Sequence, residues 1–147
     1  MLIYVDMDTK LIQLIYVSTA THELNTDELN KILDSCVQHN EQNDVTGLLL
    51  YVEGSFMQVV EGPEKSIDEL TGRLEHDSRH HSILVLSRSE IFTREFASWS
   101  MGFKSIVRAD LRDHPQFVPF FSSDFNPVQL GTPGLALEIM QVMAKQI

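Results

Sequence analysis

The chain has 147 residues, of which 43% are hydrophobic and 22% are charged, a composition typical of one globular domain. A formal net charge of −10, with no cluster of Lys and Arg, argues against direct binding to nucleic acid. No apolar run approaches the roughly 20 residues that cross a bilayer, and the N-terminus lacks a basic signal region, so we expect a cytoplasmic protein with no membrane partner.

The first predicted elements are a strand and a helix. Residues 11–18 are apolar, β-branched and aromatic, which predicts a strand after an N-terminal extension of residues 1–10. Asn25, followed three residues later by Glu28, predicts the start of a helix. The apolar stripe of this helix consists of Leu29, Ile32, Leu33, Cys36 and Val37.

Four further strands and a second helix are predicted downstream. The strands are expected at residues 46–52, 56–60, 81–91 and 99–107. The first two are joined by a short turn that contains Gly54. Pro63 suits the first turn of the second helix, which buries Ile67, Leu70 and Leu74.

The order β-α-β-β-α-β-β predicts an α+β, ferredoxin-like fold, with two helices on one face of an antiparallel sheet and a last strand that extends it. We interpret residues 11–107 as this domain and residues 108–147 as a C-terminal helical extension for packing or oligomerisation. Up to residue 134 the extension is expected to be irregular or a short helix. The face expected on its final helix consists of Leu135, Ile139, Val142 and Met143.

Three polar side chains occur where apolar ones are expected: Tyr16, Asn40 and Gln58. A buried amide without partners costs about 1–3 kcal/mol. If the first and third strands are neighbours, Tyr16 and Gln58 could form a hydrogen bond on the helix-facing side. The three side chains could form a structural network, or they could surround a flat ligand that has hydrogen-bonding edges.

Several short motifs follow one another in a fixed order. They are Tyr16-Val17-Ser18, His39-Asn40, Val45-Thr46-Gly47, FMQVVEG at 56–62, DSRH at 77–80 and FASWSM at 96–101. Together they resemble the BLUF family, the flavin-binding blue-light sensors, over about residues 11–106, and the short chain resembles its stand-alone members. The sequence LIYV occurs twice, but only the copy with Tyr16 carries the motif serine, so Tyr4 is expected to be a packing residue.

The resemblance implies a reversible photochemical reaction. It places a non-covalent flavin between the two helices, with Tyr16 as the donor of an electron and a proton. Gln58 is implied as the relay, whose orientation or tautomer changes in light so that the flavin carbonyl gains a hydrogen bond. The result would be a red-shifted state that recovers in the dark.

The resemblance also implies the binding residues. Asn40 would hydrogen-bond the polar edge of the flavin, and Arg79 would suit a phosphate. The positions near the ribityl chain and phosphate are His39, Asp77, Arg79 and His80. The apolar walls would be Ile32, Cys36, Leu49, Phe56 and Leu74, each of which could equally be a core residue. The cofactor is expected to be FAD, with FMN or riboflavin as alternatives.

No metal site is expected. His76 and His80 have the i, i+4 spacing of a helical metal pair, but no third ligand is near them in sequence. The single cysteine excludes a cysteine zinc cluster as well as an internal disulfide.

Trp99 and Met101 alternate with Ser100, so we expect them to share one face of the last strand. The resemblance implies that they relay the signal and that Met101 or Trp99 faces the flavin. The output would pass through the C-terminal segment to an unidentified signalling protein, from a homo-oligomer that is not an enzyme.

Two alternatives belong to other classes. A ferredoxin-like acylphosphatase needs an anion-binding loop after the first strand, but residues 18–22 contain neither glycine nor arginine. A non-photoactive ligand-binding regulatory domain with the same fold remains the main alternative.

Overall fold

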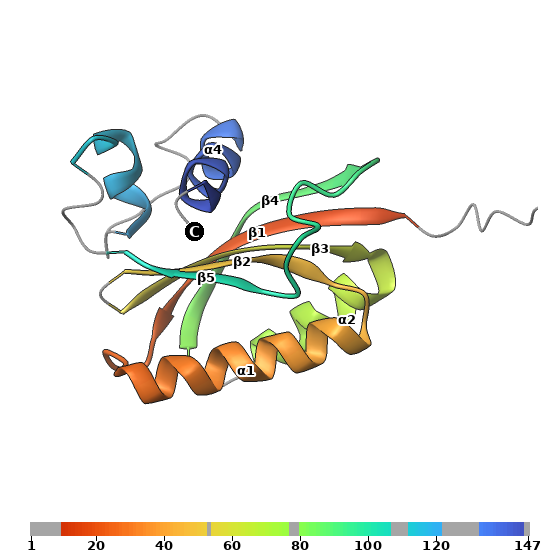
Figure 1. Ribbon diagram of the computed structural model, residues 1–147, viewed down its shortest axis with the longest axis horizontal. Coiled ribbons are helices and arrows are strands. Elements are labelled where there is room, and N and C mark those ends of the chain that lie inside the picture. Colours follow the sequence, from red (N-terminus) through yellow and green to blue (C-terminus); the bar gives the residue numbers. More distant parts are fainter. Residues whose placement is uncertain (1–9, 53, 77–79, 107–111, 122–132, 146–147) are drawn as a thin grey trace, which may run out of the picture.

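A five-stranded sheet with helices on both faces forms the protein (Figure 1). The computed structural model describes residues 10–52, 54–76, 80–106, 112–121 and 133–145. In chain order its elements are β1 (Leu11–Ala20), α1 (Thr26–Gln42), β2 (Thr46–Val52), β3 (Ser55–Pro63), α2 (Glu64–Glu75), β4 (His80–Ile91), β5 (Gly102–Ser105), the 3-10 helix η2 (Pro115–Phe121) and α4 (Pro133–Ala144).

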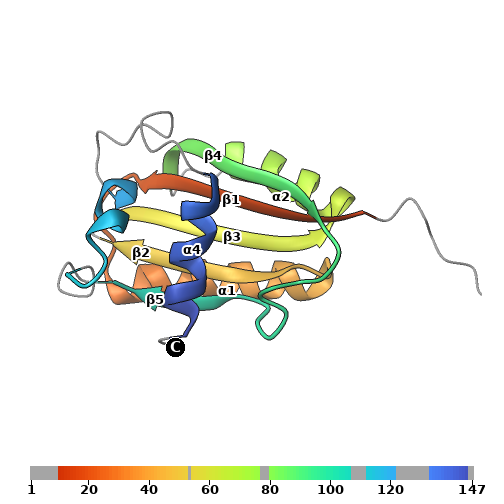
Figure 2. The ribbon, with the colours of Figure 1, turned by 90° about the horizontal axis from the view of Figure 1, so that it is seen from above.

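The predicted ferredoxin-like arrangement is confirmed. The strand order is β4-β1-β3-β2-β5, and neighbouring strands are antiparallel except for β5, which runs parallel to β2. Since β4 and β5 are opposite edges, residues 92–101 must cross from one edge to the other. Figure 2 shows this connection passing across one end of the sheet.

Each face of the sheet carries its own apolar cluster, because successive strand residues point to opposite sides. Helices α1 and α2 cover one face, and α4 covers the other (Figure 1). Tyr16 and Leu49 belong to the cluster under α1 and α2, whereas Ile15 and Met57 belong to the cluster under α4. The inner strands are therefore apolar almost throughout, as in any sheet covered on both faces.

The predicted cap of α1 is confirmed. The Asn25 side chain accepts a hydrogen bond from the Glu28 backbone N–H at 2.9 Å, and the Glu28 side chain accepts one from the Asn25 N–H. A hydrogen bond with the His22 imidazole and the bond from the Asn25 backbone lower the pKa of the Glu28 carboxyl group, so it is ionised at neutral pH. The positive N-terminal end of the helix dipole stabilises this negative charge.

The last strand was predicted to begin at residue 99, and this start was wrong. Strand β5 begins at Gly102; Ser100 and Met101 before it lie in a bend, and Trp99 lies outside any strand. Strand alternation does not apply there, so Trp99 and Met101 do not share a face. Met101 belongs to the cluster under α1 and α2, and Trp99 packs against the cluster under α4.

The final helix is present, but its buried face differs from the predicted one. Its fully covered residues are Ala136, Ile139, Met140 and Met143, while Leu135 and Val142 are half-buried. Helix α4 is apolar around most of its circumference, so periodicity alone could not fix the face. Residues 1–9, and Tyr4 with them, lie outside the described part of the chain.

No helix within the described ranges is long and apolar enough to cross a membrane.

Replacing the cap of α1 should destabilise the protein. We expect Asn25→Ala to lower the free energy of unfolding by about 1 kcal/mol, because the Glu28 N–H loses its acceptor. Urea denaturation measures this value. Asn30→Ala, an exposed change within the same helix, is the control and should leave stability unchanged or slightly higher. Equal effects of the two substitutions would contradict the capping role.

Candidate functional site

Tyr16 and Gln58 form a buried pair at the centre of the sheet. They lie directly opposite each other on β1 and β3, and the Tyr16 hydroxyl donates a hydrogen bond to Gln58 Oε1. Their exposed fractions are only 2% and 5%. The contact predicted from strand pairing is therefore present on the face covered by α1 and α2.

The other end of the Gln58 amide faces Met101. Gln58 Nε2 donates to Met101 Sδ at 3.5 Å, and Met101 is also buried. A thioether is a weak acceptor that cannot donate, whereas a phenol can do both. The observed amide orientation therefore satisfies both ends, and a turned amide would place its oxygen beside a group that has no proton to give.

Asn40 joins α1 to the segment that carries Met101. It is 1% exposed at the end of α1, and its Nδ2 donates to the Ser100 carbonyl at 2.7 Å. The Asn40 carbonyl accepts from the Val45 N–H at 2.9 Å, where the chain turns into β2. Asn40 thus connects the end of α1 to the residue that precedes Met101.

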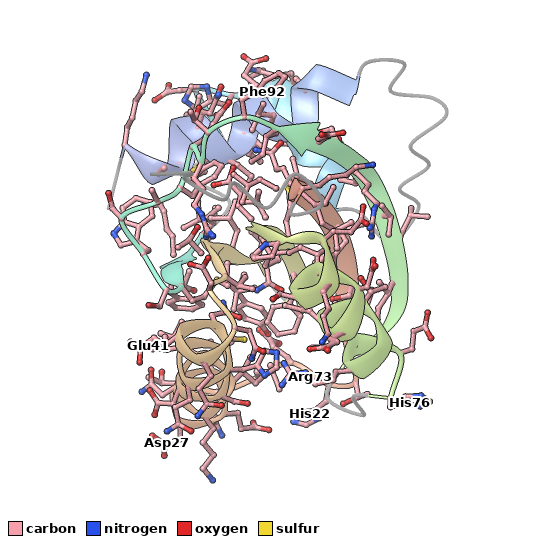
Figure 3. The ribbon with its side chains drawn as sticks, turned by 90° about the vertical axis from the view of Figure 1, so that its right-hand side faces the viewer. His22, Asp27, Glu41, Arg73, His76 and Phe92 are labelled. Atoms are coloured by element: carbon pink, nitrogen blue, oxygen red, sulfur yellow. The ribbon has the colours of Figure 1, made fainter. Side chains whose placement is uncertain are left out.

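His39 and Arg73 interact across the two helices. Figure 3 shows Arg73 reaching from α2 into the space beside α1. Burial lowers the pKa of the His39 imidazole, the nearby Arg73 guanidinium lowers it further, and Glu69 opposes both effects. His39 is therefore neutral at pH 7.

Arg73 is a residue that the sequence reasoning missed. It follows Leu70 by three positions, which places it at the rim of the buried face of α2. That spacing, together with a positive charge on an otherwise acidic chain, was the available signal.

The predicted apolar walls all lie in the cluster under α1 and α2. Its members from that prediction are Ile32, Cys36, Leu49, Phe56 and Leu74, together with Tyr16 and Met101. Asp77 and Arg79, and the side chain of His80, lie outside the described residues. In the part of the chain that the structure describes, no group of three or more His, Cys, Asp or Glu could hold a metal.

The side chains that line α1 and the facing sheet have the chemistry that a flat, polar-edged group would need. Leu33, Cys36 and Val37 on the inward stripe of α1 are only half-buried. Amides at Asn40 and Gln58 supply hydrogen-bonding edges, and Arg73 supplies a cation for a phosphate. These residues fit a flavin: apolar walls for its ring, amides for its edge and a cation at the rim.

The sequence matches the family described as "BLUF: Sensors of blue-light using FAD" over residues 11–102. Among curated proteins, the photoactivated adenylate cyclase subunit beta of Euglena gracilis is 33% identical over 95 residues, which are 64% of this chain and 11% of that protein. Subunit alpha from the same organism is 34% identical over 89 residues, 60% of this chain and 9% of its own length. The chain thus spans only about a tenth of these relatives.

Solved structures resemble a larger part of the chain. The dark state of BlrB, described as a BLUF protein, has a TM-score of 0.76 and 27% identity, covering 96% of this chain and all of BlrB (100%). The photo-activated state of BlsA has a TM-score of 0.69 and 26% identity, with 88% and 91% covered. Klebsiella pneumoniae BlrP1 with FMN and cyclic diGMP has a TM-score of 0.60 and 27% identity, with 65% and 26% covered.

The electrostatic contact between His39 and Arg73 can be tested by titration. In Arg73→Gln we expect the pKa of His39, measured by NMR, to rise toward but not reach its ordinary value, because burial still lowers it. Because the pKa of His39 is lower in the folded chain, the unfolded chain binds a proton at His39 more readily. The contribution of His39 to stability therefore rises with pH between its folded and unfolded pKa values. Arg88→Gln, which removes a surface arginine paired with Asp68 at 2.7 Å, is the control. The same His39 titration in both variants would contradict the contact.

Proposed function

The chain belongs to the BLUF family of blue-light flavin sensors, and on that premise we propose that Tyr16 and Gln58 are its photochemical pair. The observation that carries this proposal is the buried hydrogen bond from the Tyr16 hydroxyl to Gln58 Oε1. This bond places a hydroxyl that can lose its proton beside an amide that can exchange its donor and acceptor ends. Both side chains lie in a region that water does not reach.

The bound flavin would supply the absorption of blue light and, once excited, an acceptor for one electron. Tyr16 is the donor of that electron, and loss of an electron from a phenol makes its hydroxyl strongly acidic. The Oη proton then moves along the existing hydrogen bond to Gln58 Oε1. Gln58 would then pass a different proton from Nε2 to the cofactor that accepted the electron, or turn its amide.

Either change exchanges the donor and acceptor that Gln58 presents. The cofactor edge beside it then receives a different hydrogen bond, which moves the absorption band slightly to the red. The electron and proton would return to Tyr16 while the changed amide of Gln58 persists, so the red-shifted state would contain an oxidised cofactor. The amide would revert in the dark, and the cycle would need no covalent bond to Cys36.

Residues of α1, α2 and the sheet would hold the flavin. Asn40 is assigned to the polar edge of the ring, and His39 with Arg73 to the phosphate side. The apolar walls in this assignment are Ile32, Cys36, Leu49, Phe56 and Leu74. The family motif adds Asp77, Arg79 and His80 near the ribityl chain and phosphate. The cofactor is FAD in this proposal, with FMN or riboflavin as alternatives.

The signal leaves through Met101 and Trp99. Met101 contacts Gln58, and Trp99 packs against the cluster under α4 on the opposite face. In this proposal residues 11–107 are the sensor, after an extension of residues 1–10. Residues 108–147 are the output segment, which acts on an unidentified signalling protein and supports a homo-oligomer.

A sensory rather than enzymatic role is part of the proposal. The relatives named as cyclases align with this chain over 95 and 89 residues, a small part of their length. The shared segment is the one that the family described as blue-light sensors occupies.

The photochemical roles can be tested with two tyrosine variants. Tyr16→Phe should retain bound flavin but form no red-shifted state, because the electron and proton donor at Gln58 is lost. Tyr51→Phe is the matched control: Tyr51 lies in the same cluster, but its hydroxyl accepts a bond from the Leu24 N–H at 2.9 Å. Difference spectra under blue light measure both. A normal red shift in Tyr16→Phe would contradict the role of Tyr16.

The assignment of Arg73 to the phosphate predicts a selective loss of affinity. Arg73→Gln should raise the Kd for FMN about tenfold or more, because a charge-assisted hydrogen bond is removed. The Kd for riboflavin, which has no phosphate, should change little. Fluorescence titration of flavin-stripped protein measures both constants, with Arg88→Gln as the control. Equal weakening for the two flavins would place Arg73 away from the phosphate.

A further inference from the structure

Glu61 is a buried carboxyl group that the photochemistry above does not use. It lies on β3 three residues after Gln58, with 0% of its surface exposed. Strand alternation points it to the face covered by α4, with Met57 and Val59. A buried carboxylate is costly unless it is well hydrogen-bonded, and an apolar residue of similar size is often at least as stable. The reason for a carboxyl group at this position therefore lies in the groups that it binds.

Among the described residues, three neutral N–H groups donate to the Glu61 carboxyl group. Oε1 accepts from the Phe96 backbone at 2.7 Å, and Oε2 accepts from the Glu95 backbone at 3.1 Å and from Gln13 Nε2 at 2.9 Å. Gln13 lies opposite Glu61 on β1, so it fixes the carboxyl group in the sheet. The carboxyl group in turn ties two consecutive amides of the β4–β5 connection to the sheet.

The guanidinium of Arg94 strengthens the same attachment. It donates to the backbone carbonyls of Glu61 at 2.9 Å and Asp44 at 2.7 Å, and to Thr46 Oγ1 at 2.9 Å. The connection is thus attached by a side chain of its own and by one from β3.

The connection reaches Gln58 at one end and α4 near the other. Toward β5, the Trp99 carbonyl accepts from the Gly47 N–H at 3.1 Å, the Ser100 carbonyl accepts from Asn40 at 2.7 Å, and Met101 contacts Gln58. Beside the Glu61 attachment, the Glu95 carboxylate accepts from Gln141 Nε2 of α4 at 2.6 Å.

We propose that Glu61 is a positioning residue that holds the β4–β5 connection so that Met101 faces Gln58 and its displacement reaches α4. The inference rests on the proposed function, because it takes Gln58 as the group whose hydrogen bonds change in light. A turned Gln58 withdraws the N–H that Met101 Sδ accepts. A connection tied at Glu95 and Phe96 transmits the resulting shift through Glu95 to Gln141, whereas an untied one absorbs it locally.

Hydrogen exchange of the flavin-loaded protein, in the dark and under blue light, tests this role. In Glu61→Gln we expect the amides of Glu95 and Phe96 to exchange about tenfold faster in the dark, because the glutamine amide keeps only one acceptor oxygen. The light-dependent change in residues 133–145 should be lost, while the red-shifted state still forms because Tyr16 and Gln58 are intact. Glu90→Gln, the same change on the exposed surface of β4, should match the wild type.

The outcomes separate the two proposals. A Glu61→Gln protein that exchanges like Glu90→Gln in both readouts would overturn the positioning role. If Glu61→Gln does not fold, Gln141→Ala on the surface of α4 tests the inference instead. The inference requires that this variant shows a normal red shift but no light-dependent exchange change in α4. An unchanged light response of α4 rejects the inference. A wild type that shifts red without any change in exchange at residues 92–101 also rejects it. A wild type with no red shift contradicts the proposed function itself.

Discussion

The antiparallel register of β1 and β3, which sets Tyr16 opposite Gln58, is the constraint on which the site depends. A slip of one residue would turn Gln58 to the face under α4 and separate the pair, because side chains alternate along a strand. The short turn at Gly54, whose φ of 89° suits glycine, sets the pairing of β3 with β2. The pairing of β1 with β4, on its other side, shifts in register between Ile15 and Tyr16. The pairing of β1 with β3, which sets Tyr16 opposite Gln58, has no such shift.

The sheet separates two layers, and the β4–β5 connection joins them. Tyr16 and Gln58 face α1 and α2, where the inward stripe of α1 is only half covered. The opposite layer is closed by α4. Within the described residues, Met101 lies in one layer and Trp99, two positions earlier, packs in the other. The backbone from Trp99 to Met101 is therefore a short covalent link between the two layers.

Much of the fold and the central pair could be predicted from the sequence, because each depends on a local pattern. The period of the hydrophobic residues predicted the helices and most of the strands, and the spacing of Asn25 and Glu28 predicted the cap of α1. The strand pairing of a ferredoxin-like fold predicted the contact between Tyr16 and Gln58. The opposite facing of Trp99 and Met101 was not predictable, because it depends on where β5 begins, and strand ends are weakly encoded. The contacts of the Glu61 carboxyl group were missed because its donors, two backbone amides and the side chain of Gln13, are more than thirty residues away in sequence.

The visible absorption spectrum of the purified protein tests the central claim most directly. It should be recorded in the dark, during blue illumination and during recovery. If Tyr16 and Gln58 form a reversible photochemical pair, the protein will show a flavin spectrum that shifts slightly to the red in light and returns in the dark. A protein that cannot be loaded with flavin, or one that binds flavin and bleaches without a shift, would contradict the claim and leave the buried pair with a structural role only.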